Sequence, residues 1–170
     1  MNLKKLCCFL LFGAKNKNSY NYEVTRLNMF NQIRGSYSIF DYNKENDMFR
    51  YGGKYRRKYK RANYKQGLIE DHHIIPKQFV NHDIIKKLNF DVACSNNLLI
   101  MPSRLARPII NDENIIYHQG HHLYNEYVGD KLEYILSNHE YIEDDKYIFW
   151  LFFKHLETKL CMNDKSVPWN

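Results

Sequence analysis

Two adjacent histidines, His72 and His73, follow two carboxylates and precede an apolar pair closed by a proline. The apolar and β-branched residues around them predict a strand over Gly67 to Pro76, ended by that proline. Neighbouring side chains on a strand point to opposite faces. The two histidines therefore cannot do the same job: one can bind a metal ion while the other meets a substrate.

Two later segments complement this strand. Asn97 opens a second predicted strand, Leu98 to Met101. From about Asn114 the spacing predicts a helix that carries His118 and His122. Residues four apart share one helical face, so these two histidines can both reach one metal ion.

The rest of the chain predicts helical packing around these segments. Its 170 residues suit one domain with extensions. Apolar spacing predicts a helix over Phe79 to Leu88, and the aromatic run at 147–153 predicts a buried C-terminal helix that ends near Cys161. The cysteines lack Cys-x-x-Cys spacing, which argues against a zinc ribbon, and a Cys94–Cys161 bridge stays open.

Residues 50–65 form a basic stretch in which eight of sixteen residues are Lys or Arg and four are Tyr. Such a stretch binds phosphates through charge and counterion release, and tyrosine rings stack on unpaired bases. The alternatives are a solvated face or a nuclear import signal. The candidate phosphate contacts, with two arginines of a later loop, are Arg50, Lys54, Arg56, Arg57, Lys58, Lys60, Arg61, Arg104 and Arg107.

The N-terminal segment 1–18 combines two lysines with a nine-residue apolar run. That run is shorter than the roughly 20 residues that cross a bilayer, so no integral membrane span is expected. It is either a weak signal or anchor segment or a packed N-terminal element. An intracellular protein is favoured, with secretion as the alternative. The expected division is a leader at 1–18, an extension at 19–66, a core at 67–138, and a C-terminal helix and tail at 139–170.

Three motifs together resemble the HNH, or ββα-metal, nucleases, and more closely the AHH branch of the HNH/endonuclease VII superfamily. The motifs are His72-His73-Ile74-Ile75-Pro76, Asn97-Leu98-Leu99-Ile100-Met101-Pro102, and the eleven residues from His118 to Val128. The resemblance covers roughly residues 67–136 and implies an α+β, ββα-metal core. It implies a metal-dependent endonuclease.

The resemblance also implies roles. His73 is the general base, His72 is a metal ligand, and Asn97 supports the base through its amide, for which a hydrogen bond to the imidazole is the expected means.

The remaining ligands depend on the alignment. The family's helical motif can be aligned with this sequence in two ways. Alignment from its first histidine, His118, selects His122 as the ligand, and alignment from Tyr124 selects His121. Helical spacing favours His118 with His122, and His121 stays open. Asp71 stands where the family has alanine, and it either joins the metal site or forms a salt bridge to the basic stretch.

One divalent ion is implied as cofactor, with Mg²⁺ the default and Zn²⁺, Ni²⁺ or Mn²⁺ suited to an all-histidine ligand set. The expected partner is nucleic acid, DNA rather than RNA, cleaved with low specificity because no separate sequence-reading domain is evident. Two alternatives remain: a catalytically silent nucleic-acid-binding protein with a structural zinc, and a secreted toxin with an inhibitor or immunity protein as its partner.

Overall fold

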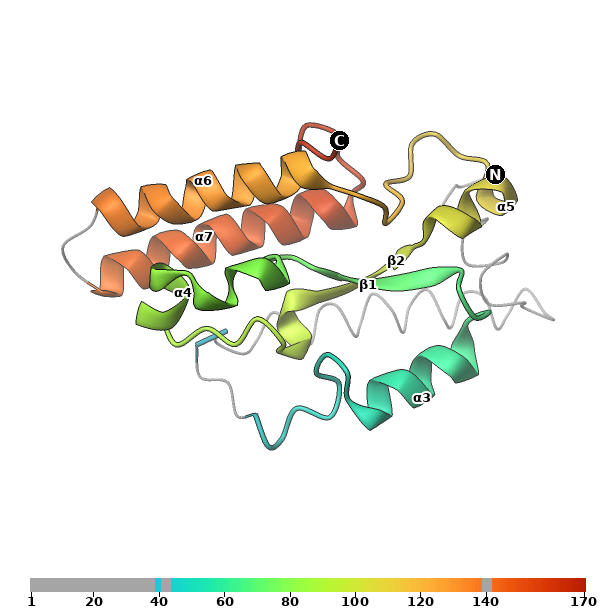
Figure 1. Cartoon of the computed structure of the whole chain (residues 1–170), viewed down its shortest axis with the longest axis horizontal. Helices are drawn as coiled ribbons and strands as arrows, with labels where there is room; N and C mark the ends of the chain where they lie inside the picture. Colours follow the sequence, from blue (N-terminus) through green and yellow to red (C-terminus); the bar gives the residue numbers. More distant parts are fainter. Residues whose placement is uncertain (1–38, 41–43, 139–141) are drawn as a thin grey trace.

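A small antiparallel sheet lies between one basic helix and a pair of long helices (Figure 1). The structure is a computed structural model that describes residues 39–40, 44–138 and 142–170. The elements, in chain order, are α3 (Lys54–Asn63), β1 (Ile69–His73), η2 (Lys77–Asn81), α4 (Asp83–Lys87), η3 (Ser95–Asn97), β2 (Leu98–Pro102), η4 (Arg104–Ala106), α5 (Arg107–Ile110), α6 (His122–Asn138) and α7 (Ile142–Cys161).

Strands β1 and β2 pair antiparallel, with His72 opposite Leu99 and His73 opposite Leu98. Figure 1 shows α6 and α7 side by side on one side of this sheet and α3 on the other. The α+β class is confirmed, and the sequence order β1, β2, α6 is compatible with the predicted ββα core.

Apolar stripes on the two long helices form the main core. Helix α6 buries positions spaced by three or four residues, and α7 does the same on its facing side, as expected for amphipathic helices. These buried residues are Tyr124, Val128, Leu132 and Ile135 of α6 and Phe149, Phe153, Leu156 and Leu160 of α7. The aromatic run at 147–153 therefore belongs to a helix as predicted, but only one face of it is buried, and Tyr147 and Trp150 are exposed.

Asparagines end several helices. Asn89, Asn111 and Asn163 follow α4, α5 and α7 and have φ values of 51°, 46° and 54°. Asparagine tolerates this left-handed conformation better than other side-chain-bearing residues, so it can turn the chain at once after a helix. The last of these turns sends the chain from α7 back toward the sheet.

Three predicted elements are shorter than expected. The first strand runs over Ile69–His73 rather than from Gly67 to Pro76. The helix predicted for Phe79 to Leu88 divides into η2 and α4, because the His82 ring accepts a hydrogen bond from the Ile84 amide and caps a new helix there.

The third correction concerns the helix predicted from Asn114, which begins only at His122. The main chain of His118 is instead extended: its N–H donates to Pro102 O at 2.7 Å, and its carbonyl accepts from Arg104 N at 3.1 Å. His118 thus bridges to the end of β2, through Ser103, and this pairing prevents a helix from starting earlier.

Two further expectations concern the ends and the cysteines. The leader at 1–18 lies outside the described residues. Cys94 is a buried thiol, so the Cys94–Cys161 bridge that the sequence left open does not form. Among the helices of residues 44–138 and 142–170, none has the length and apolarity that a bilayer crossing requires.

Candidate metal centre and adjoining strand

Strand β1 presents different chemistry on its two faces. Glu70 and His72 point to one face, and Asp71 and His73 point to the other, as alternation requires. The first pair meets the loop before α6, because Glu70 contacts His118. The second pair faces α3, because Asp71 is bonded to that helix. We call these the metal face and the basic face of β1.

His72 is fully buried on the metal face, with 1% of its surface exposed. Neither of its ring nitrogens has a hydrogen-bond partner among the described residues. Burial, followed by the neighbouring His121 and His118 rings, lowers the pKa of His72 well below its ordinary value, so the ring is neutral. A buried imidazole with two unbonded nitrogens is costly unless something else binds them.

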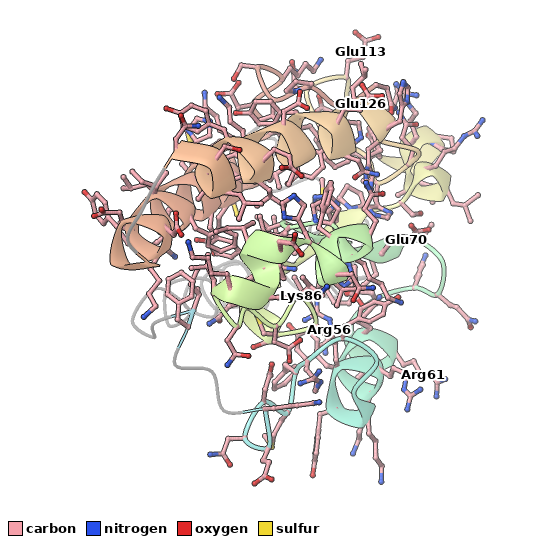
Figure 2. The ribbon with its side chains drawn as sticks, turned by 60° about the vertical axis from the view of Figure 1, so that its left-hand side comes forward. Arg56, Arg61, Glu70, Lys86, Glu113 and Glu126 are labelled. Carbon is pink, nitrogen blue, oxygen red and sulfur yellow. The ribbon has the colours of Figure 1, made fainter. Side chains whose placement is uncertain are left out.

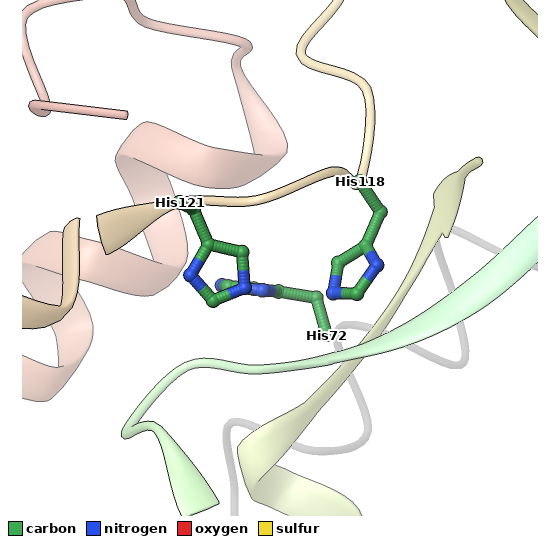
Figure 3. A group of neighbouring side chains, drawn as sticks. All are labelled: His72, His118 and His121. Carbon is green, nitrogen blue, oxygen red and sulfur yellow. The ribbon is translucent and has the colours of Figure 1, made fainter. Parts of the chain in front are cut away.

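The rings of His118 and His121 lie beside His72. Their ring centroids are 5.5 and 5.1 Å from that of His72 and 5.4 Å from each other. One nitrogen from each of the three histidines lies within 4.8 Å of the other two, a spacing that could hold one metal ion. Figure 3 shows the rings of His118 and His121 each turning one nitrogen toward His72.

Hydrogen bonds fix which nitrogen each outer ring offers. His118 Nδ1 lies 2.5 Å from Glu70 Oε2, and His121 Nδ1 lies 3.1 Å from the amide oxygen of Asn125. Because carboxylate and amide oxygens accept hydrogen bonds, each of these rings donates from Nδ1, and Nε2 is the ring nitrogen that is left to bind a metal ion. This second contact to each ring is typical of histidines that bind metals.

His121, rather than His122, therefore completes the cluster. His122 is the first residue of α6 and its side chain is exposed. The shared helical face expected for His118 and His122 does not exist, because His118 lies in the loop before α6. Burial is the main cause that lowers the pKa of His121, which keeps this ring neutral as well.

His73 occupies a different environment on the basic face. Its half-buried ring lies edge-on to the Tyr51 ring, with the centroids 4.6 Å apart. Lys77 Nζ lies over the same Tyr51 ring, 5.2 Å from its centre. Burial, which outweighs the opposing charge of Asp71, lowers the pKa of His73 to about 4. The ring is therefore unprotonated at neutral pH and can accept a proton.

Asn97 holds the strand exit rather than the imidazole. Its amide oxygen accepts from Ile75 N at 2.7 Å, and its amide nitrogen donates to Ile75 O at 2.9 Å and Val92 O at 2.7 Å. Both amide protons are thus used by main-chain carbonyls, and the expected bond from this amide to the His73 ring does not form. Tyr124 Oη donates to Ile74 O at 2.5 Å, which clamps the same segment from α6.

Asp71 pairs with the basic helix. Its Oδ1 accepts from Arg56 Nε at 3.0 Å and from a terminal nitrogen of Arg56 at 2.9 Å, and Lys60 Nζ lies 3.1 Å from Oδ2. Burial would raise the pKa of Asp71, but the hydrogen bond and charge of Arg56, with those of Lys60, outweigh it and lower the pKa. Of the two readings left open, the salt bridge is the one that forms.

The basic residues of α3 therefore lie on two different sides of the helix, one facing β1 and one facing outward. Arg56 and Lys60 face β1, and Arg50 pairs with Asp91 at 3.0 Å. Figure 2 shows Arg56 directed into the protein and Arg61 directed away from it. The outward stripe, spaced 3, 1 and 3 residues apart, borders an open hollow of about 630 Å³ and consists of Lys54, Arg57, Lys58 and Arg61.

Arg104 and Arg107 lie elsewhere, on η4 and α5. Both are exposed, and Arg107 lies over the Tyr117 ring, 5.6 Å from its centre. The main-chain contact between Arg104 and His118 places this arginine next to the histidine loop.

Sequence reasoning missed four residues around the cluster. Two had local signals: Glu70 is two residues before His72 on the same strand face, and Asn125 is four residues after His121. Tyr124 and Trp169 are packed against His72, with ring centroids 5.1 and 5.0 Å away. For Trp169, which is distant in sequence, no local signal existed.

Comparisons with known proteins bear on the middle of the chain. Residues 55–148, more than half of the chain, match the model of a family described as AHH, a nuclease family of the HNH/ENDO VII superfamily with conserved AHH. No curated protein and no solved structure gives a significant match. The matched region contains both strands, α6, the three clustered histidines and most of α3.

Proposed function

This chain belongs to the AHH nuclease family of the HNH/ENDO VII superfamily, and from that premise we propose that it is a metal-dependent endonuclease that cuts DNA with low sequence specificity. The observation that carries the proposal is His72, buried with both ring nitrogens unbonded among the described residues and next to two histidines whose Nδ1 atoms are hydrogen-bonded and whose Nε2 atoms are left to bind a metal ion. A histidine that only packed in the core would be expected to have its ring nitrogens hydrogen-bonded.

Three imidazoles within reach of one another fit a divalent ion. His72, His118 and His121 would hold it, with Nε2 as the donor of the last two. HNH superfamily nucleases use a divalent metal, which when bound supplies positive charge to the phosphate and the leaving oxygen. Nitrogen donors suit Zn²⁺ or Ni²⁺ better than Mg²⁺, which prefers oxygen, so we favour Zn²⁺ or Ni²⁺ here.

His73 is the proposed general base. Its pKa of about 4 keeps it free of a proton at neutral pH, and a phosphate group beside it would raise that pKa and strengthen the base. The main-chain hydrogen bonds that Asn97 and Tyr124 make to the two residues after His73 hold the strand exit in place. Asn97 is thus a positioning residue for the base rather than a group that contacts the reacting atoms.

The outward stripe of α3 is the proposed contact for the nucleic-acid backbone. It lies on the same side of the sheet as His73, because Asp71 on the basic face anchors the inner side of α3. Lysine and arginine bind phosphates whatever the sequence, which supports cleavage of low specificity. The stripe comprises Lys54, Arg57, Lys58 and Arg61.

The decisive experiment is a nicking assay on supercoiled plasmid and on a matched RNA. Purified protein is stripped with EDTA and then given Zn²⁺, Ni²⁺, Mn²⁺ or Mg²⁺ singly. We expect nicking only with added metal and a loss of about 10²–10⁴-fold in His73→Ala, the usual contribution of a general base. Metal binding and circular dichroism of that variant should match the wild type.

Three other results would change the proposal. Faster cleavage of RNA would reverse the substrate preference. Undiminished cleavage by His73→Ala would remove His73 as the base. Metal binding and salt-dependent DNA binding without cleavage of either nucleic acid would favour a binding protein with a structural zinc.

A further inference from the structure

The chain after α7 returns to the histidine cluster and covers it. The indole ring of Trp169 lies 5.0 Å from the His72 ring and 5.1 Å from the His121 ring, measured between centroids. Tyr124 lies 5.1 Å from His72 and 5.3 Å from Trp169. Together these two aromatic side chains wall the buried imidazole.

The tail is held in this position by its own contacts. Lys159 Nζ and Asp164 Oδ2 are 2.5 Å apart, and the other oxygen of Asp164 accepts from Ser166 N at 2.9 Å. Val167 is buried in the main core, with 3% of its surface exposed. The turn at Asn163 is therefore followed by a fixed segment rather than a loose end.

Two hydrogen bonds join the tail to the loop that carries His118. Asn163 Oδ1 accepts from Ile116 N at 2.9 Å, and Trp169 Nε1 donates to Tyr117 O at 3.2 Å. These bonds hold the two residues directly before His118. The loop between α5 and α6 has little regular structure, so these two bonds, together with the main-chain bonds of His118 to Pro102 and Arg104, hold it in place.

We infer that Trp169 is a positioning residue of the metal centre, which holds the His118 loop through its indole N–H and shields His72 from water with its ring. The inference rests on the proposed function, because it assumes that the cluster binds a divalent ion. It goes beyond family membership, since Trp169 lies outside the matched residues 55–148. Apolar groups around a metal control solvent access, and outer contacts to ligands typically change metal affinity by about 10–100-fold.

Trp169 and Trp150 are the only tryptophans in the sequence, and this makes a direct test possible. In Trp150→Phe, all tryptophan fluorescence comes from Trp169. Titration with Ni²⁺ or Co²⁺, whose open d shells quench nearby indoles, should quench that emission with the same midpoint as calorimetric binding. In the matched control Trp169→Phe, the remaining Trp150, exposed on α7, should keep its emission.

Affinity provides the second readout. Zn²⁺ and Ni²⁺ binding, measured by competition with a chelating dye, should weaken by about 10–100-fold in Trp169→Ala, the range for outer contacts to metal ligands. Trp169→Phe keeps an aromatic ring and loses the N–H, so its metal affinity should lie between those of the wild type and Trp169→Ala. If Trp169→Ala does not fold, the quenching titration and Trp169→Phe still decide the matter.

The possible failures are distinguishable. A wild-type chain that binds no divalent ion overturns the metal centre and this inference with it. A wild-type chain that binds tightly, with no quenching of Trp169 or with unchanged affinity in both variants, overturns the inference alone and leaves the nuclease proposal standing.

Discussion

The two faces of β1 put adjacent histidines into opposite circumstances. On the metal face, His72 is enclosed by two histidines and two aromatic rings, and its ring nitrogens are without hydrogen bonds in the described part of the chain. On the basic face, His73 is half-buried next to an exposed tyrosine and on the side where a basic helix packs. One peptide bond separates the proposed metal ligand from the proposed general base.

The difference teaches that residue type alone does not assign a role. Burial lowers the pKa of both histidines, so both are neutral at pH 7. A neutral imidazole can donate its lone pair to a metal or take a proton from water. Which of these it does depends on the partners its face of the strand supplies. The predictions below separate the two faces, from the largest expected effect to the smallest.

The largest difference between the two faces should appear in metal affinity when His72 and His73 are each replaced by alanine. His72→Ala should weaken Zn²⁺ or Ni²⁺ binding by more than the roughly 10–100-fold that loss of an outer contact causes, because a ligand itself is removed. His73→Ala should leave metal affinity unchanged. Isothermal titration calorimetry of the two proteins decides this, and equal losses in both would erase the distinction between the faces.

Arg56 and Arg57 provide a matched pair on the basic face. Arg56→Ala should lower the free energy of unfolding by at most about 3–5 kcal/mol, since it leaves Asp71, with 12% of its side chain exposed, with Lys60 as its remaining ion-pair partner. Arg57→Ala should change stability by no more than about 0.5 kcal/mol and weaken DNA binding instead. Urea denaturation and DNA titration at several salt concentrations measure both, and comparable stability losses would refute the division of α3 into two sides.

Glu70 tests the metal face more finely. Glu70→Gln removes the charge that holds the Nδ1 proton of His118, and metal affinity should fall by about 10-fold, the low end of the range for outer contacts, because Glu70 is half-exposed. Glu126→Gln, on the exposed side of α6, is the control and should have no effect. An unchanged affinity in Glu70→Gln would show that His118 is oriented by its main chain alone.

Acid should destabilise the metal-free protein through His73. The unfolded chain binds a proton at His73 near pH 6.5, whereas the folded chain binds it only near pH 4. Between these values the unfolded state holds more protons, so the free energy of unfolding should fall as pH drops from about 6.5 to 4 and stay flat above. Urea titrations across this range would show the slope, which His73→Gln should reduce.

The existence of the strand that carries both histidines was predictable from local signals, but its end was not, because β1 stops at His73, three residues before the proline. The partners of its faces were less so. The basic stretch reads as uniform in the sequence, and only the helical phase of α3 turns Arg56 and Lys60 inward. His121 was displaced in the prediction by His122, because the bonds that keep His118 extended come from β2, many residues earlier. Trp169 reaches the cluster only through the packing of α7.

The ion pair between Arg56 and Asp71 has a mechanical consequence. The guanidinium, with 3% of its side chain exposed, ties α3 to the middle of β1, two residues before His73. The helix that would bind a nucleic acid and the imidazole that would take a proton from the attacking water are therefore held in a fixed relative position. We predict that cuts fall at a constant offset from the phosphates that α3 protects, which hydroxyl-radical footprinting compared with the cleavage map would reveal; a variable offset would mean that the grip lies elsewhere.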